Sequence, residues 1–189
     1  MSHTDIIFRA VEFAARARTA QLSQSADVPD IVHPFGVAII HPFGVAKILI
    51  DHTCPDELVA ADILHDALDD TGTTVENIRR VFGDRIAQLV DAVSEPDKNR
   101  EKHTLEYLIT APMDILLVSC ADRLDNVRAI ADDYAKLSEA LWTSFNRPEG
   151  SQPWYLGSTD DRVINRAEGK PSTVLFNEFK HVVSSIFQN

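Results

Sequence analysis

Several features that would indicate other classes of protein are absent from this 189-residue sequence. No apolar run approaches the roughly 18 residues that a membrane-spanning helix requires, so we predict no membrane segment. The N-terminus MSHTDIIFRA lacks a basic start followed by an apolar stretch, which indicates no signal peptide and favours a cytoplasmic protein. The two cysteines, Cys54 and Cys120, show no C-x-x-C spacing, and we expect both to be reduced thiols.

Basic residues are outnumbered, with 18 Lys and Arg against 29 Asp and Glu and a formal net charge of −11. Proteins that bind nucleic acids carry basic faces that neutralise phosphates, so this balance argues against a nucleic-acid partner. An acidic protein can still bind an anion where a metal ion or a local group of Arg and Lys reverses the sign in the site. A small anionic ligand therefore stays possible.

Alternating apolar and polar residues, which are typical of strands, are also absent, whereas apolar spacings of three and four recur along the chain. The segment after Pro112 is predicted to be a long helix with apolar residues on all its sides, which indicates a helix at the centre of a domain. Thr73 and Glu76 have the spacing of a capping box. The other predicted helices cover about 4–21, 55–68, 73–83, 84–93, 101–110 and 172–188. We predict an all-α protein with a single domain over residues 1–189.

The segment LHDALDDTGTT, residues 64–74, gathers one imidazole and three carboxylates at the end of an apolar helix. Residues four apart share a helix face, which places His65 near Asp69 and Asp66 near Asp70. Like charges at close range repel unless a cation or a proton intervenes, and a divalent metal would explain the cluster. The alternative is a solvated acidic helix end, although carboxylates are unfavourable at the negative end of a helix dipole. From these residues alone both interpretations stay open.

The segment SCADRLDN, residues 119–126, places Asp122 directly after a strongly apolar run. An unpaired carboxylate in or near a core costs several kcal/mol, so Asp122 requires a metal ion, an arginine or both. A buried Asp–Arg pair is the alternative to a metal ligand. Arg123 is a nearby cation that can meet an anion.

Nearly the same eight residues occur twice in succession, as HPFGVAII from His33 and HPFGVAKI from His41. Solenoids need at least about three units of roughly 20 residues or more, so this doubling cannot build one. Proline at the first position of a helix places the preceding histidine at the helix cap, from which it could reach a metal. A lone histidine is more often a packed or surface residue than a ligand.

These segments together resemble the HD-domain phosphohydrolases, and in particular the hydrolase domain of the RelA/SpoT family and its small stand-alone relatives, the metazoan SpoT homologue among them. The resemblance rests on VEFAARA, on HPFGVAKIL with LHDALDDTGTTVENIRRVFG, and on ADRLDNVR, in order over about residues 5–130. It implies a helical bundle around a single divalent ion, manganese in the family, which suits mixed His and carboxylate ligation. The ligands carried over are His41 or His33, His65, Asp66 and Asp122.

The resemblance also implies a reaction, the removal of pyrophosphate from the 3′ position of guanosine tetra- or pentaphosphate (ppGpp or pppGpp). Carried over, the acidic pair implicated in catalysis is Asp69 and Asp70, and Asn126 contacts the nucleotide. Metal binding is expected to lower the pKa of a bound water, while Asp69 or Asp70 orients that water or moves its proton. The candidate cations for the phosphates are Lys47, Arg123 and Arg16.

Two departures from the family keep other functions open. The family usually has Glu-Asp where this chain has Asp69-Asp70, and the shorter side chain loses about 1 Å of catalytic reach. The family loop with Arg-Lys-Asp-type residues corresponds here to QLSQSAD, which has no basic residue. The alternatives are a phosphohydrolase of another nucleotide or small phosphate ester, and a catalytically impaired metal-binding helical module. The oligomeric state is left open.

Only one of the doubled histidines can occupy the first ligand position. Eight helical residues rise about 12 Å and turn about 80° beyond two full turns, so a straight helix cannot offer His33 and His41 to one ion. Because added length costs least in a loop, we place the copy with His33 there and predict His41 as the ligand.

Overall fold

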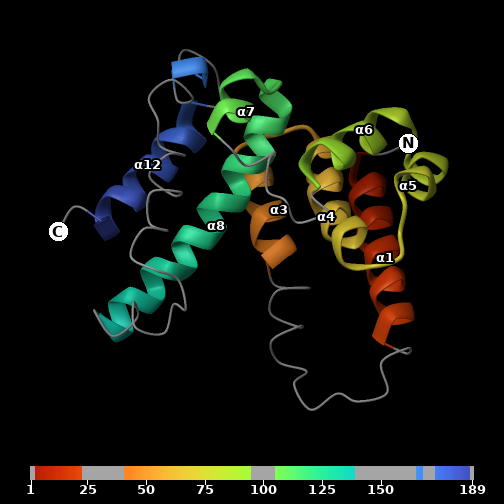
Figure 1. Cartoon of the computed structure of the whole chain (residues 1–189), viewed down its shortest axis with the longest axis horizontal. Coiled ribbons are helices and arrows are strands. Elements are labelled where there is room, and N and C mark those ends of the chain that lie inside the picture. Colours follow the sequence, from red (N-terminus) through yellow and green to blue (C-terminus); the bar gives the residue numbers. More distant parts are fainter. Residues whose placement is uncertain (1–2, 23–40, 95–104, 139–164, 168–172, 188–189) are drawn as a thin grey trace.

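The computed structural model of the chain describes residues 3–22, 41–94, 105–138, 165–167 and 173–187. Within these ranges every regular element is helical, which confirms the all-α prediction (Figure 1). The helices are α1 (His3–Leu22), α3 (His41–Asp51), α4 (Asp56–Asp70), α5 (Val75–Phe82), α6 (Asp84–Val93), α7 (Leu105–Thr110), α8 (Met113–Leu137), the 3-10 turn η4 (Asn165–Ala167) and α12 (Thr173–Phe187). None of these helices is long and apolar enough to cross a membrane.

Turn-forming and capping residues mark the ends of the helices around α5, but the cap at the start of α5 lies one residue later than predicted. The capping box of α5 pairs Thr74 with Asn77, one position later than the predicted pair of Thr73 and Glu76. Thr73 instead accepts a hydrogen bond from the Thr71 hydroxyl, which holds it in the preceding turn. Gly83 separates α5 from α6 at a φ of 88°, a conformation that glycine adopts without steric cost.

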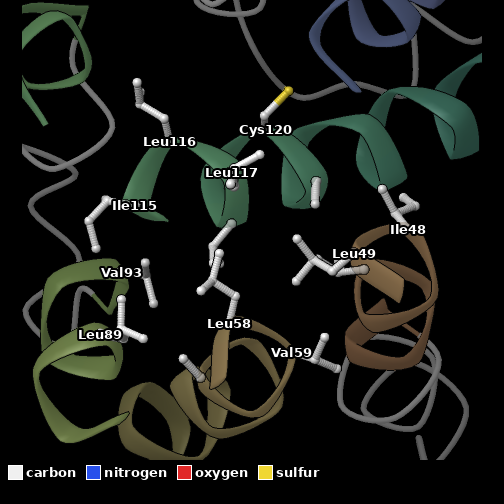
Figure 2. Packing of buried hydrophobic residues seen from close by; sticks show 14 of the residues in the cluster. Ile48, Leu49, Leu58, Val59, Leu89, Val93, Ile115, Leu116, Leu117 and Cys120 are labelled. Atoms are coloured by element: carbon white, nitrogen blue, oxygen red, sulfur yellow. The ribbon is translucent and has the colours of Figure 1, made fainter. Parts of the chain in front are cut away.

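Helix α8 lies at the centre of the described helices, as its apolar girth predicts. It packs against α3, α4 and α6 on one side and against α12 on the other (Figure 1). Figure 2 shows the division: Leu49 of α3 and Leu58 of α4 point toward α8, whereas Cys120 points from α8 to the opposite side. Successive side chains along α8 therefore face different neighbours, which decides which of its polar residues can meet α3 and α4.

Helix α4 is the second buried element, and it carries the acidic segment at its C-terminal end. Leu58, Val59 and Leu64 are fully or almost fully buried, and α1 covers the helix from outside. Helix α3 also packs against both α4 and α8. His41 at the start of α3 contacts Asp122 in the middle of α8, and the charge of Asp122 acts on His65 in the second half of α4, so these three places lie close together. Polar side chains at these three places are brought together.

Candidate metal centre

His41 is the first residue of α3, and its imidazole bridges two carboxylates of α8. Its Nδ1 atom lies 2.7 Å from Asp125 Oδ2, and its Nε2 atom lies 2.9 Å from Asp122 Oδ1. Burial lowers the pKa of His41, but the hydrogen bonds and charges of Asp122 and Asp125 outweigh it and raise the pKa to about 10. Near neutral pH both ring nitrogens therefore carry protons and donate to the carboxylates.

Gly44, one turn after His41, permits this arrangement. A Cβ atom at position 44 would lie 2.8 Å from Asp125 Cγ and closer still to Asp125 Oδ1, distances that real Cβ contacts essentially never show. The absence of a side chain at Gly44 thus leaves room for the Asp125 carboxylate beside α3. Asp125 was not among the predicted site residues, although its spacing of three from Asp122 puts both on one helix face.

His65 lies in the last turns of α4, with its two ring nitrogens in different surroundings. Nδ1 donates a proton to the main-chain oxygen of Asp62 at 2.5 Å, and Nε2 lies 3.2 Å from Asp66 Oδ1. Burial lowers the pKa of His65, but the nearby charges of Asp66, Asp62 and Asp122 raise it to about 9. The bond to the carbonyl fixes the ring so that Nε2 is presented on the side of Asp66.

Asp62 is, after Asp125, the second member of this group that the sequence analysis did not single out. Its side chain is 0% exposed, and within the described part of the chain neither carboxylate oxygen has a hydrogen-bond partner. Burial raises the pKa of Asp62 to about 8, against the opposing charges of His65 and His41. An acidic residue inside the apolar run LVAADIL is the same signal that drew attention to Asp122, and it could have identified Asp62 as well.

Arg18 is the third residue that was missed, and it comes from α1. Its guanidinium lies 3.4 Å from Asp66 Oδ2 and 3.8 Å from Asp70 Oδ2. Ala10 is fully buried and Ala14 is partly buried against the core, and the spacing of four places Arg18 on the same face of α1. That spacing was available from the sequence.

A family model described as "HD domain" matches residues 10–151. The chain belongs to the HD-domain family. This assignment confirms the family resemblance of the three sequence segments. The histidine and aspartate that follow one another at the end of α4, His65 and Asp66, are the pair from which we predicted it.

Relatives of this HD-domain protein carry specific names. It is 36% identical over 135 residues to guanosine-3′,5′-bis(diphosphate) 3′-pyrophosphohydrolase of Aquifex aeolicus, across 68% of this chain but 18% of that protein. It is 32% identical over 135 residues to guanosine-3′,5′-bis(diphosphate) 3′-pyrophosphohydrolase MESH1 of Danio rerio, across 67% of this chain and 70% of that protein. The chain thus spans less than a fifth of the length of the bacterial proteins that head these matches.

Two solved structures share the fold. The Listeria monocytogenes protein lmo0812 superposes with a TM-score of 0.67 at 30% identity, over 79% of this chain and 99% of that one. A metazoan orthologue of SpoT superposes with the same TM-score of 0.67 at 19% identity, over 97% of both chains. The second likeness supports the fold alone.

The donor atoms of this HD domain fit a divalent cation in their chemistry. Two imidazoles and several carboxylates are the mixed set that such ions accept. Within the described ranges no three His, Cys, Asp or Glu side chains stand in position to hold an ion as they are. His41 and Asp122 bond each other instead, and Asp66 faces Arg18. The Oδ2 atom of Asp66 also has no hydrogen-bond partner among the described residues, a deficit that a cation would relieve.

Arg123, a predicted contact for the phosphates, lies away from this group. One residue along a helix turns by about 100°, which carries Arg123 to the α12 side of α8 when Asp122 faces α3. Arg123 is only 3% exposed. It lines a small cavity together with Leu108, Leu116, Ser119, Cys120, Phe176 and Phe179.

The two other predicted cations also lie outside the group. Lys47 is exposed on α3 and pairs with Asp51 at 2.5 Å, one helical turn away. Arg16 is exposed on α1 and pairs with Glu12 at 2.6 Å. Both take part in local pairs of the kind that contribute little to stability.

The remaining predicted residues lie at or beside the group. Asn126 donates from Nδ2 to the main-chain oxygen of Asp122 at 3.0 Å. Asp69 is partly buried and Asp70 is exposed at the end of α4. His33 falls outside the described residues. His41 is thus the doubled histidine that the structure describes, and it lies against Asp122.

Proposed function

We propose that the protein is a metal-dependent phosphohydrolase that removes pyrophosphate from the 3′ position of guanosine tetra- or pentaphosphate, as a single domain over residues 1–189. One observation carries the proposal: in a chain of the HD family, His41, His65, Asp66 and Asp122 come together from α3, α4 and α8. The named relatives in Aquifex aeolicus and Danio rerio support the substrate. A net charge of −11 supports a small nucleotide rather than a nucleic acid as the ligand.

The proposed ligands are the Nε2 atoms of His41 and His65 and the carboxylates of Asp66 and Asp122. HD hydrolases depend on a divalent metal, and we propose Mn²⁺ because His and carboxylate donors together suit it. When bound, the ion would lower the pKa of a water and polarise a phosphoryl oxygen.

The protein groups around this position have separate tasks in the proposal. Asp69 and Asp70 stand at the end of α4, one turn beyond the HD pair, where a carboxylate can orient the attacking water or accept its proton. Asn126 lies one turn after Asp122 and is the proposed contact for the nucleotide. Arg18 takes the place of Arg16 as the cation from α1, because it is the one that lies beside Asp66 and Asp70.

A second candidate keeps the chemistry and changes the substrate to another nucleotide or a small phosphate ester. The specific observation in its favour is that few positive charges lie near the proposed ligands in the part of the chain that the structure describes. QLSQSAD contains no basic residue, and Lys47, Arg16 and Arg123 lie away from the group of ligands.

The test is release of pyrophosphate and phosphate with Mn²⁺ across a panel of nucleotides. Pyrophosphate release from ppGpp supports the first candidate, and turnover of other esters alone supports the second. No turnover with metal bound would indicate a catalytically impaired module. His65→Ala should abolish both metal binding and turnover, whereas the matched change His181→Ala, at an exposed position on α12, should leave both unchanged. Full activity of His65→Ala would refute the site.

A further inference from the structure

Asp62 stands out among the buried polar residues because nothing in the described structure satisfies it. It lies in the middle of α4 and is completely inaccessible to solvent. Oxygen atoms of a carboxylate that is shut off from water normally accept two or more hydrogen bonds, yet among the described residues Oδ1 and Oδ2 have none. Such a group is expected to have a role that the isolated protein does not display.

The surroundings of Asp62 indicate the kind of partner. Oδ1 lies 3.8 Å from His65 Nδ1, on the side of the ring opposite to Asp66. The charges of Asp122, Asp66 and His41 also act on the carboxyl group of Asp62, so Asp62 lies within electrostatic range of the other proposed ligands. A buried cation at that group would be the missing opposite charge.

We propose that Asp62 is a positioning residue of the metal centre, which holds His65 through its main-chain oxygen and supplies a further carboxylate, buried beside the ring, that favours a divalent cation. The proposal rests on the proposed metal-dependent function. The main-chain oxygen of Asp62 already accepts the Nδ1 proton of His65, and the carboxylate of Asp62 lies beside the same nitrogen. Carboxylates behind a ligating histidine fix the ring and make it a stronger donor.

The position of Asp62 on α4 makes it a supporting group rather than a replacement for a ligand. Asp62 and His65 are three apart and Asp62 and Asp66 four apart, so all three lie on the face of α4 that meets α3 and α8. Asp66 lies next to Nε2 of His65, whereas Asp62 lies next to Nδ1. Removing the carboxylate of Asp62 should therefore weaken the binding of the ion, although all four proposed ligands stay in place.

The experiment compares Asp62→Asn with the wild-type chain in two measurements. Asparagine keeps the shape of the side chain and removes its ability to carry charge. Calorimetric titration with Mn²⁺ should show an affinity about 10- to 100-fold lower, the usual loss when such a supporting group is removed. Thermal unfolding in chelator should give a melting temperature equal to or above that of the wild type, because a buried unsatisfied carboxylate has been replaced. Asp132→Asn, the same change at an exposed position of α8, is the control and should alter neither quantity.

The outcomes separate this inference from the proposed function. A wild-type chain that binds no divalent ion would overturn both. Metal binding by the wild type with less than a twofold change in Asp62→Asn would overturn the role of Asp62 and leave the metal centre intact. A lower melting temperature of the metal-free variant would also overturn it, since Asp62 would then have its partner within the fold itself.

Discussion

Gly44 allows a quantitative test of the contact between α3 and α8. Changing glycine to alanine within a helix normally stabilises a protein, by up to about 1 kcal/mol. In this protein the added methyl group would overlap the Asp125 carboxylate, with Cβ at 2.8 Å from Cγ and 3.0 Å from Oδ2. Helix backbone cannot move away cheaply, so the Asp125 side chain must rotate and give up its bond to His41 Nδ1.

The size of the effect follows from two opposing contributions. A hydrogen bond between charged groups contributes roughly 1.5–3 kcal/mol. After subtraction of the gain in helix propensity, Gly44→Ala should lower the free energy of unfolding by about 0.5–2 kcal/mol. The assay is urea unfolding of the metal-free protein in chelator near neutral pH, where His41 is protonated.

A double-mutant cycle with Asp125→Ala isolates the cause. Once the carboxylate is gone, the methyl group has nothing to overlap, and Gly44→Ala should stabilise the Asp125→Ala protein. The sign of the effect therefore reverses between the two backgrounds. A stabilising Gly44→Ala in the wild-type background would refute the close approach of Asp125 to α3.

Two further predictions concern His41. Its folded-state pKa of about 10 lies above the ordinary value of 6.5, so the stability that it contributes is fully present below pH 6.5 and is lost as the pH rises through 10. Urea unfolding of the metal-free protein should show this decline, and His41→Gln should make it shallower; an equal slope in both proteins would contradict the ion pairs with Asp122 and Asp125. Titration of His33→Ala and His41→Ala with Mn²⁺ tests which of the two repeated histidines is the metal ligand. Only His41→Ala should lose Mn²⁺ binding. Loss in His33→Ala alone would show that the first copy provides the ligand.

The sequence by itself determined the helices and the family. Apolar residues that recur every three or four positions predict helices and their buried faces. Burial of those faces stabilises the helices whichever elements they pack against. The motif that includes His65 and Asp66 depends on residues that are adjacent in the chain, so no tertiary contact was needed to recognise it. The one-residue error at the α5 cap, Thr74 instead of Thr73, arose because both residues offer the same hydroxyl.

Only the tertiary structure decided which polar side chains meet. Periodicity places Asp122 and Arg123 about 100° apart on α8, but it does not say which of the two directions leads to α3 and which to α12. In the same way, the spacing from Ala10 and Ala14 places Arg18 on the buried face of α1, but only the packing of α1 on α4 puts Arg18 beside Asp66 and Asp70. The unsatisfied carboxylate of Asp62 became apparent only when α3, α4 and α8 were assembled, because burial and hydrogen bonding depend on all three helices together.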